Sequence, residues 1–220
     1  MLTAISQNHK RNQNRRYVDL LENNYVDYFE KFGINFIPIP NNSQNIGGYF
    51  KNFPIDSLIL TGGINIGESR IRDRTEGKLL EIAIKNDLPV FGICRGMQFI
   101  NYFFGGTLIK NLNDKLEFSL GHVNNTHEVV LLKGKTNNFF RGDSFKVNSY
   151  HNQGILAENL SDNLKIFAIS TIDGVIEGIF HKQYPIVGIQ WHPERNGSNK
   201  HFDELLVKAF LQRGLYWSKK

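Results

Sequence analysis

The single cysteine of the chain lies in "PVFGICRGMQFI" (89–100), where an apolar strand pattern changes into a helical one. Gly92 and Gly96 flank Cys94 and leave room for a sharp turn from strand to helix. Such a turn would place Cys94 at a helix N-terminus, where unpaired backbone N–H groups favour a thiolate. A lone cysteine is more often a small buried residue, but the flanking glycines indicate a nucleophile.

A second apolar strand pattern ends in "GIQWHPE" and supplies an imidazole and a carboxylate. His192 can act as general base and general acid, and Glu194 can hold its ring in one tautomer. Pro193 keeps the preceding residue extended, so His192 and Glu194 point the same way. His-Pro-Glu alone is typical of an ordinary loop. Together with the cysteine turn, it predicts a catalytic unit of Cys94, His192 and Glu194.

A nucleophile of this kind needs two fixed donors for the oxyanion that forms on attack. The backbone N–H of Arg95, the residue after the cysteine, is the first. We assign the second to Gly63, because Gly62-Gly63 follows the apolar strand "SLIL" and allows close approach of a substrate. The alternative for this pair of glycines is an ordinary tight turn.

An α/β pattern of strands and helices positions these residues. Apolar strands are expected at "LTAIS", "INFIPI", "SLIL", "PVFGI" and "IVGIQ". Helices are expected from Val18 to Phe32, from a capping box at Asp73 through Lys85, and in a last segment containing Phe202. This alternation predicts a mostly parallel sheet flanked by helices, with ligands at the carboxyl ends of the strands.

The segments "EVVLL", "FKVNS", "LKIFAIS" and "VIEGIF" predict a small antiparallel ribbon beside the parallel sheet. The 220 residues, 40% of them hydrophobic, fit one domain over 1–220. No apolar run reaches the about 18 residues of a membrane span, and one cysteine cannot form an internal disulfide. We therefore expect a cytoplasmic protein that does not bind a membrane.

The net charge of +5 is mild for a nucleic-acid-binding protein, and we expect no nucleic-acid partner. Two basic clusters, "HKRNQNRR" (9–16) and "RIRDR" (70–74), fit solvated surfaces. The alternative is an electropositive rim for a substrate that carries phosphate.

The chain resembles the class I glutamine amidotransferase superfamily, in the branch of stand-alone γ-glutamyl hydrolases (peptidase C26) that includes the γ-glutamyl-γ-aminobutyrate hydrolases. The resemblance rests on "SLILTGG", "GICRGMQFINYFFGGTL", "HEVVL", "VNSYHNQ", "DGVIEGI" and "GIQWHPE". It implies a flavodoxin-like fold with a Cys94, His192 and Glu194 triad. It also implies an oxyanion hole formed by the N–H groups of Gly63 and Arg95.

The resemblance further implies that the side chain of Gln98 and the backbone around Ser149 and Tyr150 hold the glutamyl group. Gln98 lies four residues after Cys94, hence on the same helical face, and its amide offers both donor and acceptor. The alternative for Gln98 is a solvated helix residue.

Three further histidines have no assigned role. His151 in "VNSYHNQ" is either bonded to the backbone or in contact with substrate. His122 and His127 either line the site or lie elsewhere.

The implied reaction is attack of the Cys94 thiolate on a γ-glutamyl amide, giving a γ-glutamyl thioester that water hydrolyses to glutamate. His192 protonates the departing nitrogen and then activates the water, so neither a metal nor an organic cofactor is expected. The expected partner is a small-molecule γ-glutamyl substrate, with no obligatory synthetase subunit.

The leaving group is the less determined half of the substrate. If Arg70, Arg72 and Arg74 lie on the rim of the site, their guanidinium groups suit a phosphate. With the overall similarity, this suggests the γ-glutamyl-CDP-amidate hydrolase type, which acts in capsular polysaccharide modification. The alternatives are a glutaminase subunit that supplies ammonia to a separate synthetase, a γ-glutamyl-polyamine or γ-glutamyl-γ-aminobutyrate hydrolase, and a non-enzymatic binding module.

Overall fold

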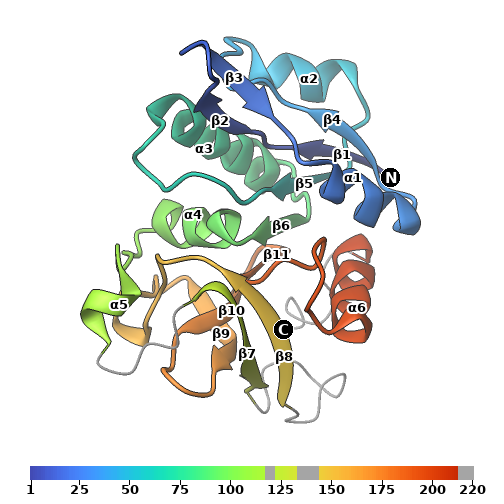
Figure 1. Ribbon diagram of the computed structural model, residues 1–220. Coiled ribbons are helices and arrows are strands. Elements are labelled where there is room, and N and C mark those ends of the chain that lie inside the picture. Colours follow the sequence, from blue (N-terminus) through green and yellow to red (C-terminus); the bar gives the residue numbers. More distant parts are fainter. Residues whose placement is uncertain (117–121, 133–143, 213–220) are drawn as a thin grey trace.

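A nine-stranded sheet forms the centre of the molecule, in the order β4-β1-β5-β6-β11-β10-β9-β7-β8. The computed structural model describes residues 1–116, 122–132 and 144–212 (Figure 1). The strands are β1 Leu2–Ile5, β2 Asn8–Arg11, β3 Tyr17–Leu20, β4 Asn35–Pro38, β5 Ser57–Leu60, β6 Val90–Ile93, β7 Val123–Leu131, β8 Ser144–Tyr150, β9 Leu164–Ser170, β10 Ile176–His181 and β11 Ile186–Ile189. The helices are α1 Asn23–Phe29, α2 Ile46–Asn52, α3 Arg70–Lys85, α4 Arg95–Phe103, α5 Leu112–Lys115 and α6 Lys200–Leu211, with short 3-10 helices at Glu30–Phe32 and Ala157–Asn159.

The first five strands of the sheet, from β4 to β11, are parallel. β1, β5, β6 and β11 are apolar and almost entirely buried, because helices cover both of their faces. β6 and β11 pair residue for residue, from Val90 with Ile186 to Ile93 with Ile189. The predicted fold class, a parallel sheet flanked by helices, is confirmed.

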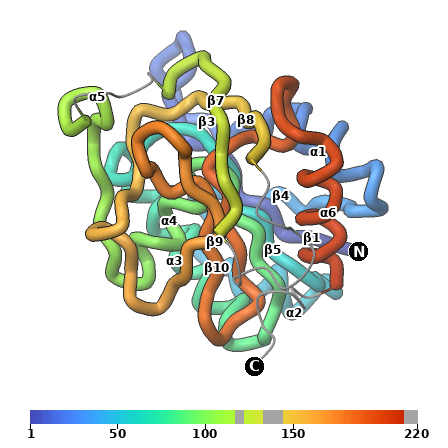
Figure 2. The backbone as a smooth tube through the Cα atoms, turned by 90° about the horizontal axis from the view of Figure 1, so that it is seen from below, coloured from blue at the N-terminus to red at the C-terminus, as the bar shows by residue number. Residues whose placement is uncertain are grey.

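Successive residues of each central strand point to opposite faces of the sheet and into different apolar cores. Ile5 and Phe91 belong to the core beneath α1 and α6. Ala4 and Leu60 belong to the core beneath α2, α3 and α4. Figure 2 shows α1 and α6 together on one side of the sheet and α3 and α4 on the other. The short strands are thus held by two layers of helices.

The four strands predicted to form antiparallel ribbon are antiparallel, and they extend the main sheet. β10 pairs antiparallel with β11, and β9, β7 and β8 follow. The reason is that the edge of β11 would otherwise expose unpaired backbone groups, which β10 covers. A second, two-stranded sheet is formed by β2 and β3, from the basic segment near the N-terminus.

Two predicted helix starts were wrong. Val18 lies in β3, where it pairs with Lys10, so the first helix begins only at Asn23. α3 begins at Arg70 rather than near Asp73, because Ser69 is its N-cap, with a side chain that accepts from the backbone N–H of Arg72 at 3.3 Å.

Among the described residues, no helix has the length and apolar character needed to cross a membrane.

Candidate active site

Three neighbouring strands, β5, β6 and β11, end at one edge of the sheet and carry the predicted site. Gly62 follows β5, Cys94 follows β6, and His192 follows β11. The N–H of Cys94 donates to the carbonyl of Ile189 at 2.8 Å, which continues the register of β6 and β11 to their ends. The site is thus built on the most buried part of the sheet.

Cys94 adopts a left-handed conformation, φ 52° and ψ −106°, between β6 and α4. Such a conformation is costly for a residue with a side chain and is found at functional turns. Gly96 makes the turn possible: a Cβ at this position would lie 2.2 Å from the carbonyl oxygen of Leu60. The glycine lets α4 start directly against β5, with Cys94 immediately before its first residue.

The imidazole of His192 lies between the thiol and a carboxylate. Its Nδ1 is 2.6 Å from Oε1 of Glu194, and Cys94 is near enough for its charge to raise the pKa of the ring. Asn148, on β8, fixes the backbone: the N–H of His192 donates to Asn148 Oδ1, and Asn148 Nδ2 donates to the carbonyl of His192, both at 2.8 Å. The structure therefore brings the three residues of the predicted catalytic unit together.

The charge of this unit is set by its burial and by its two anionic groups. Burial acts to lower the pKa of His192, but the charges of Glu194 and Cys94 outweigh it and raise the pKa to about 10. An imidazolium beside a thiol stabilises the thiolate. The arrangement can hold a nucleophile and a proton donor together at neutral pH.

The loop after β5 lies against both the thiol and the imidazole. A Cβ on Gly62 would lie 3.0 Å from Cε1 of His192 and 3.6 Å from Cβ of Cys94. The N–H of Gly62 donates to the hydroxyl of Tyr25 at 2.9 Å. Within the described residues, the N–H of Gly63 has no acceptor, so it is available to a substrate.

A buried ion network holds this loop against the start of α4. The guanidinium of Arg72 donates to the carbonyls of Thr61 and Gly62, at 2.8 and 2.9 Å. Its Nε donates to Glu76 at 2.9 Å, and the other oxygen of Glu76 accepts from Arg95. Burial raises the pKa of Glu76, but the two guanidinium groups outweigh it and lower the pKa below its usual value. Glu76 therefore links the backbone of both predicted oxyanion donors.

The predicted contact between Arg72 and a leaving-group phosphate is wrong. Arg72 is fully buried, because it lies on the face of α3 that packs against the sheet. Arg70 and Arg74 are exposed. Arg74 lines a groove of about 290 Å³ with Asn42 and Lys78, and that groove contains none of the predicted catalytic residues.

Two glutamine side chains connect the cysteine to the body of the sheet. The amide nitrogen of Gln98 donates to the carbonyl of Gln153 at 3.0 Å and to Gln190 Oε1 at 3.1 Å. Gln190 Nε2 is 3.5 Å from Sγ of Cys94. Gln98 is buried and not solvated, and its oxygen is the atom left for a substrate. Gln190 was not predicted, although strand alternation places it on the same side as His192.

Tyr150 lies at the rim of the site, whereas the side chain of Ser149 points away from it. The ring of Tyr150 packs edge-on against His192, with centroids 5.6 Å apart, and Arg195 lies 4.8 Å above its face. The hydroxyl of Ser149 is buried and donates to the carbonyl of His122 at 2.8 Å. If Ser149 contacts substrate, it does so through its backbone.

A groove of about 940 Å³ opens beside Glu194, between α1 and α6. Its lining includes Tyr150, Glu194 and Arg195 at the catalytic end. Further along it carries both cationic and anionic side chains: Lys31, Lys200, Lys208, Asp27 and Glu204. Its lining contains neither Cys94 nor His192, so the groove meets the catalytic unit at Glu194.

Comparisons with known proteins agree on one family. The family model described as Peptidase C26 matches residues 2–194. Protein NtpR of Enterococcus hirae is 31% identical, covering 91% of this chain and 95% of the relative. The gamma-glutamyl-CDP-amidate hydrolase of Campylobacter jejuni is 33% identical, covering 75% of each chain. A glutamine amidotransferase structure from Thermotoga maritima shares the fold, with a TM-score of 0.62 and 15% identity over 98% of this chain and 88% of its own.

Proposed function

The chain belongs to the peptidase C26 family, and on this premise we propose that it is a cysteine-dependent hydrolase of γ-glutamyl amides. The observation that carries the proposal is the junction of β6 and β11. There the carboxylate of Glu194 accepts a hydrogen bond from the imidazole of His192, and the charge of Cys94 acts on the same ring. A cysteine with a positive φ immediately before a helix, near a charged imidazole, is the arrangement expected of an activated nucleophile.

In the proposed mechanism, the Cys94 thiolate attacks the γ-carbonyl of the substrate and forms a C–S bond. The N–H groups of Gly63 and Arg95 stabilise the oxyanion of the tetrahedral intermediate. His192, as imidazolium, gives its proton to the nitrogen as the C–N bond breaks. The neutral imidazole then takes a proton from water, which attacks the thioester and releases glutamate.

Each supporting group has a defined task in this scheme. Glu194 keeps Nδ1 of His192 protonated, so that Nε2 is the atom that exchanges its proton with substrate and water. Gln190 contacts the sulfur of Cys94 with its amide nitrogen. Gln98 donates a hydrogen bond to the amide oxygen of Gln190 and so fixes its orientation. Glu76 keeps the two oxyanion donors at a fixed separation through Arg72 and Arg95.

For the leaving group, we propose an amine that carries phosphate. The relative from Campylobacter jejuni is named for γ-glutamyl-CDP-amidate, which has a phosphoramidate nitrogen at this position. The groove beside Glu194 supports the proposal, because its lining includes the cations Lys31 and Arg195, whose charges suit a phosphate. We propose this groove in place of the rim predicted at Arg70, Arg72 and Arg74, of which Arg72 is buried. A role in capsule modification stays a prediction.

The test is a substrate panel assayed with the purified full chain and with Cys94→Ala. The panel contains L-glutamine, a γ-glutamyl alkylamide and a γ-glutamyl nucleoside-diphosphoramidate. We expect the wild type to release glutamate without a partner protein, fastest from the phosphoramidate. Mass spectrometry should trap a γ-glutamyl adduct on the peptide that contains Cys94.

Cys94→Ala should bind the substrates and turn none of them over, whereas the matched surface variant His201→Asn should behave as the wild type. Turnover by Cys94→Ala would reject the mechanism. A silent wild-type enzyme that hydrolyses glutamine only with a synthetase would support the glutaminase alternative. Preference for the alkylamide would reject the proposal of a phosphate-bearing leaving group but would leave the proposed hydrolase activity in place.

A further inference from the structure

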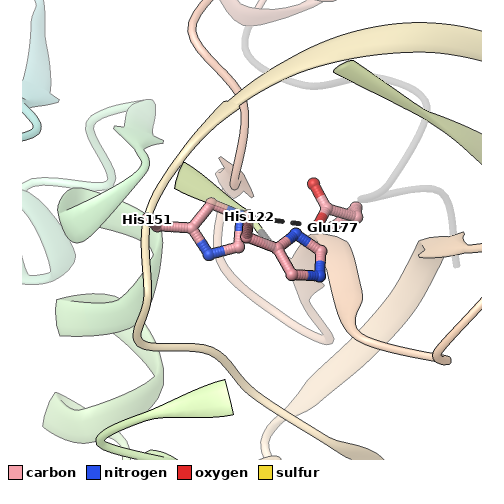
Figure 3. A group of neighbouring side chains, drawn as sticks. All are labelled: His122, His151 and Glu177. Atoms are coloured by element: carbon pink, nitrogen blue, oxygen red, sulfur yellow. Dashed lines mark ion pairs between the residues drawn. The ribbon is translucent and has the colours of Figure 1, made fainter. Parts of the chain in front are cut away.

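A second group of ionisable side chains is formed by His122, His151 and Glu177. It is connected to the proposed active site through the carbonyl of Gln153, which accepts from Gln98 and is 2.9 Å from Nδ1 of His151. The ligand atoms of the three side chains are all within 4.8 Å of one another (Figure 3). His122 precedes β7, His151 follows β8 and Glu177 lies on β10, so three antiparallel strands bring them together. Their exposed fractions are 2%, 6% and 0%. None of the three is used in the proposed mechanism.

Several polar atoms of this group are buried without a hydrogen-bond partner. Neither carboxylate oxygen of Glu177 has one among the described residues, and the same holds for Nε2 of His151. A buried carboxylate that makes no hydrogen bond is costly, so natural proteins seldom leave one in this state. The two residues approach each other without a hydrogen bond: His151 Nε2 is 3.7 Å from Glu177 Oε1.

That separation suits two ligands of one cation. In a tetrahedral zinc site with bonds of about 2.0–2.1 Å, neighbouring ligand atoms lie about 3.4 Å apart. His127 also approaches Glu177 Oε1, at 3.3 Å, and its Nε2 likewise has no hydrogen bond within the described residues. The carboxylate therefore has imidazole nitrogens at 3.3 and 3.7 Å, and the ligand atom of His122 lies within 4.8 Å of those of His151 and Glu177.

The outer hydrogen bonds of the histidines have the pattern found around metal sites, where each ligand histidine donates its other N–H to a carbonyl or carboxylate. Nδ1 of His151 is 2.9 Å from the carbonyl of Gln153, and Nε2 of His122 is 2.7 Å from Asp173. Nδ1 of His122 then faces only the hydroxyl of Ser149, whose hydrogen is given to a backbone carbonyl. Both rings thus keep one nitrogen available.

We propose that His122, His151 and Glu177 bind a divalent transition-metal ion of the zinc class, with His127 as a candidate fourth ligand. Two imidazoles and one carboxylate, with no sulfur, favour Zn²⁺ or Co²⁺ over the hard cations Mg²⁺ and Ca²⁺. The role is positional, because the carbonyl of Gln153 links this site through Gln98 to the active site. The thiol chemistry itself proceeds without a metal.

The experiment uses the full chain with Cys94→Ser, because the thiolate beside His192 is itself a metal ligand. After removal of metals with EDTA, the protein is titrated with Co²⁺ alone and with Zn²⁺ alone. We expect Co²⁺ to give saturable visible d–d absorption at equimolar metal, without a thiolate charge-transfer band. Zn²⁺ should displace the bound Co²⁺ and raise the midpoint temperature of thermal unfolding of the protein.

Added to the same background, Glu177→Gln and His151→Ala should each weaken binding at least tenfold, whereas the exposed His201→Asn should change nothing. Circular dichroism of the metal-free variants shows which of them fold. If His151→Ala does not fold, Glu177→Gln decides alone, because glutamine keeps the shape of the side chain. Absence of a saturable Co²⁺ spectrum, or equal affinity in Glu177→Gln and its parent, would overturn the proposal.

Discussion

At the scale of single residues, the proposed chemistry depends on the charge of His192. Its ring is almost fully buried, which alone would favour the neutral form, yet the carboxylate of Glu194 at 2.6 Å keeps it cationic. The cation serves twice, because it stabilises the thiolate before attack and supplies the proton to the leaving nitrogen afterwards. The alkaline limit of activity should therefore report the loss of this proton.

We expect the kcat/KM of the wild type to fall only above about pH 10, the pKa to which Glu194 and Cys94 raise His192. Glu194→Gln removes one of these negative charges, so the pKa of His192 decreases and the alkaline limb should move to lower pH. The measurement is a pH profile with γ-glutamyl-p-nitroanilide. Glu204→Gln, an exposed carboxylate of the same groove, is the control and should leave the limb in place. An unmoved limb in Glu194→Gln would contradict the assignment.

At the scale of elements, the site depends on how α3 and α4 are joined. Glu76 is fully buried on α3 and contacts one guanidinium from its own helix and one from the start of α4. Arg72 continues the network to the loop after β5. Glu76 thus connects two helices and one loop. Arg95 also pairs with Asp73 on α3 at 2.5 Å, so the loss of the Glu76 charge would leave Arg72 as the buried cation without an anionic partner among the described residues.

Glu76→Gln should lower the free energy of unfolding by about 3–5 kcal/mol, the usual cost of removing one partner of a buried ion pair. Urea unfolding at pH 7 measures it. Lys208→Gln, which breaks the exposed pair with Glu204 at 3.9 Å, should cost less than about 1 kcal/mol. If the two variants lose equal stability, the network does not join the helices as described. Where Glu76→Gln stays folded, kcat should fall more than the affinity for substrate.

At the scale of the whole molecule, the closing helix α6 packs on the sheet with an apolar face that includes Phe202 and Phe210, and it also places one carboxyl group, Asp203, in the interior. Asp203 accepts from Nε1 of Trp191 at 2.8 Å and from the hydroxyl of Ser198 at 2.5 Å, and it is 1% exposed. Burial raises the pKa of Asp203 to about 6, in spite of these two donors. The attachment of α6 is therefore sensitive to pH.

Because its folded pKa exceeds the unfolded value, Asp203 binds a proton more tightly in the native state. Its contribution to stability is favourable below about pH 4 and is lost as the pH rises through about 6. The free energy of unfolding of Asp203→Asn should therefore increase relative to that of the wild type as the pH rises, by up to about 3 kcal/mol between pH 4 and 7. Urea unfolding across this range tests it, with the exposed Asp162→Asn as control. A constant difference between Asp203→Asn and the wild type would refute it.

Local sequence determined the central elements and the residues most suited to chemistry. Runs such as "SLIL" and "PVFGI" are apolar over their whole length, and such runs form buried parallel strands wherever they lie. The turn at Cys94 was also predictable, since only glycines at positions 92 and 96 leave space for it. These features depend on near neighbours in the chain.

Tertiary structure decided which distant residues meet and which side chains are buried. Gln190 reaches Cys94 across 96 residues because β6 and β11 are adjacent in the sheet, an order that no local pattern encodes. The sequence predicts an exposed Arg72, because a charged residue in a basic cluster is usually solvated. Only the packing of α3 shows that Arg72 lies on the buried face of the helix. His122, His151 and Glu177 come together only because β7, β8, β9 and β10 extend the main sheet. Strand order and helix orientation depend on packing over the whole chain, and this is why sequence alone could not assign them.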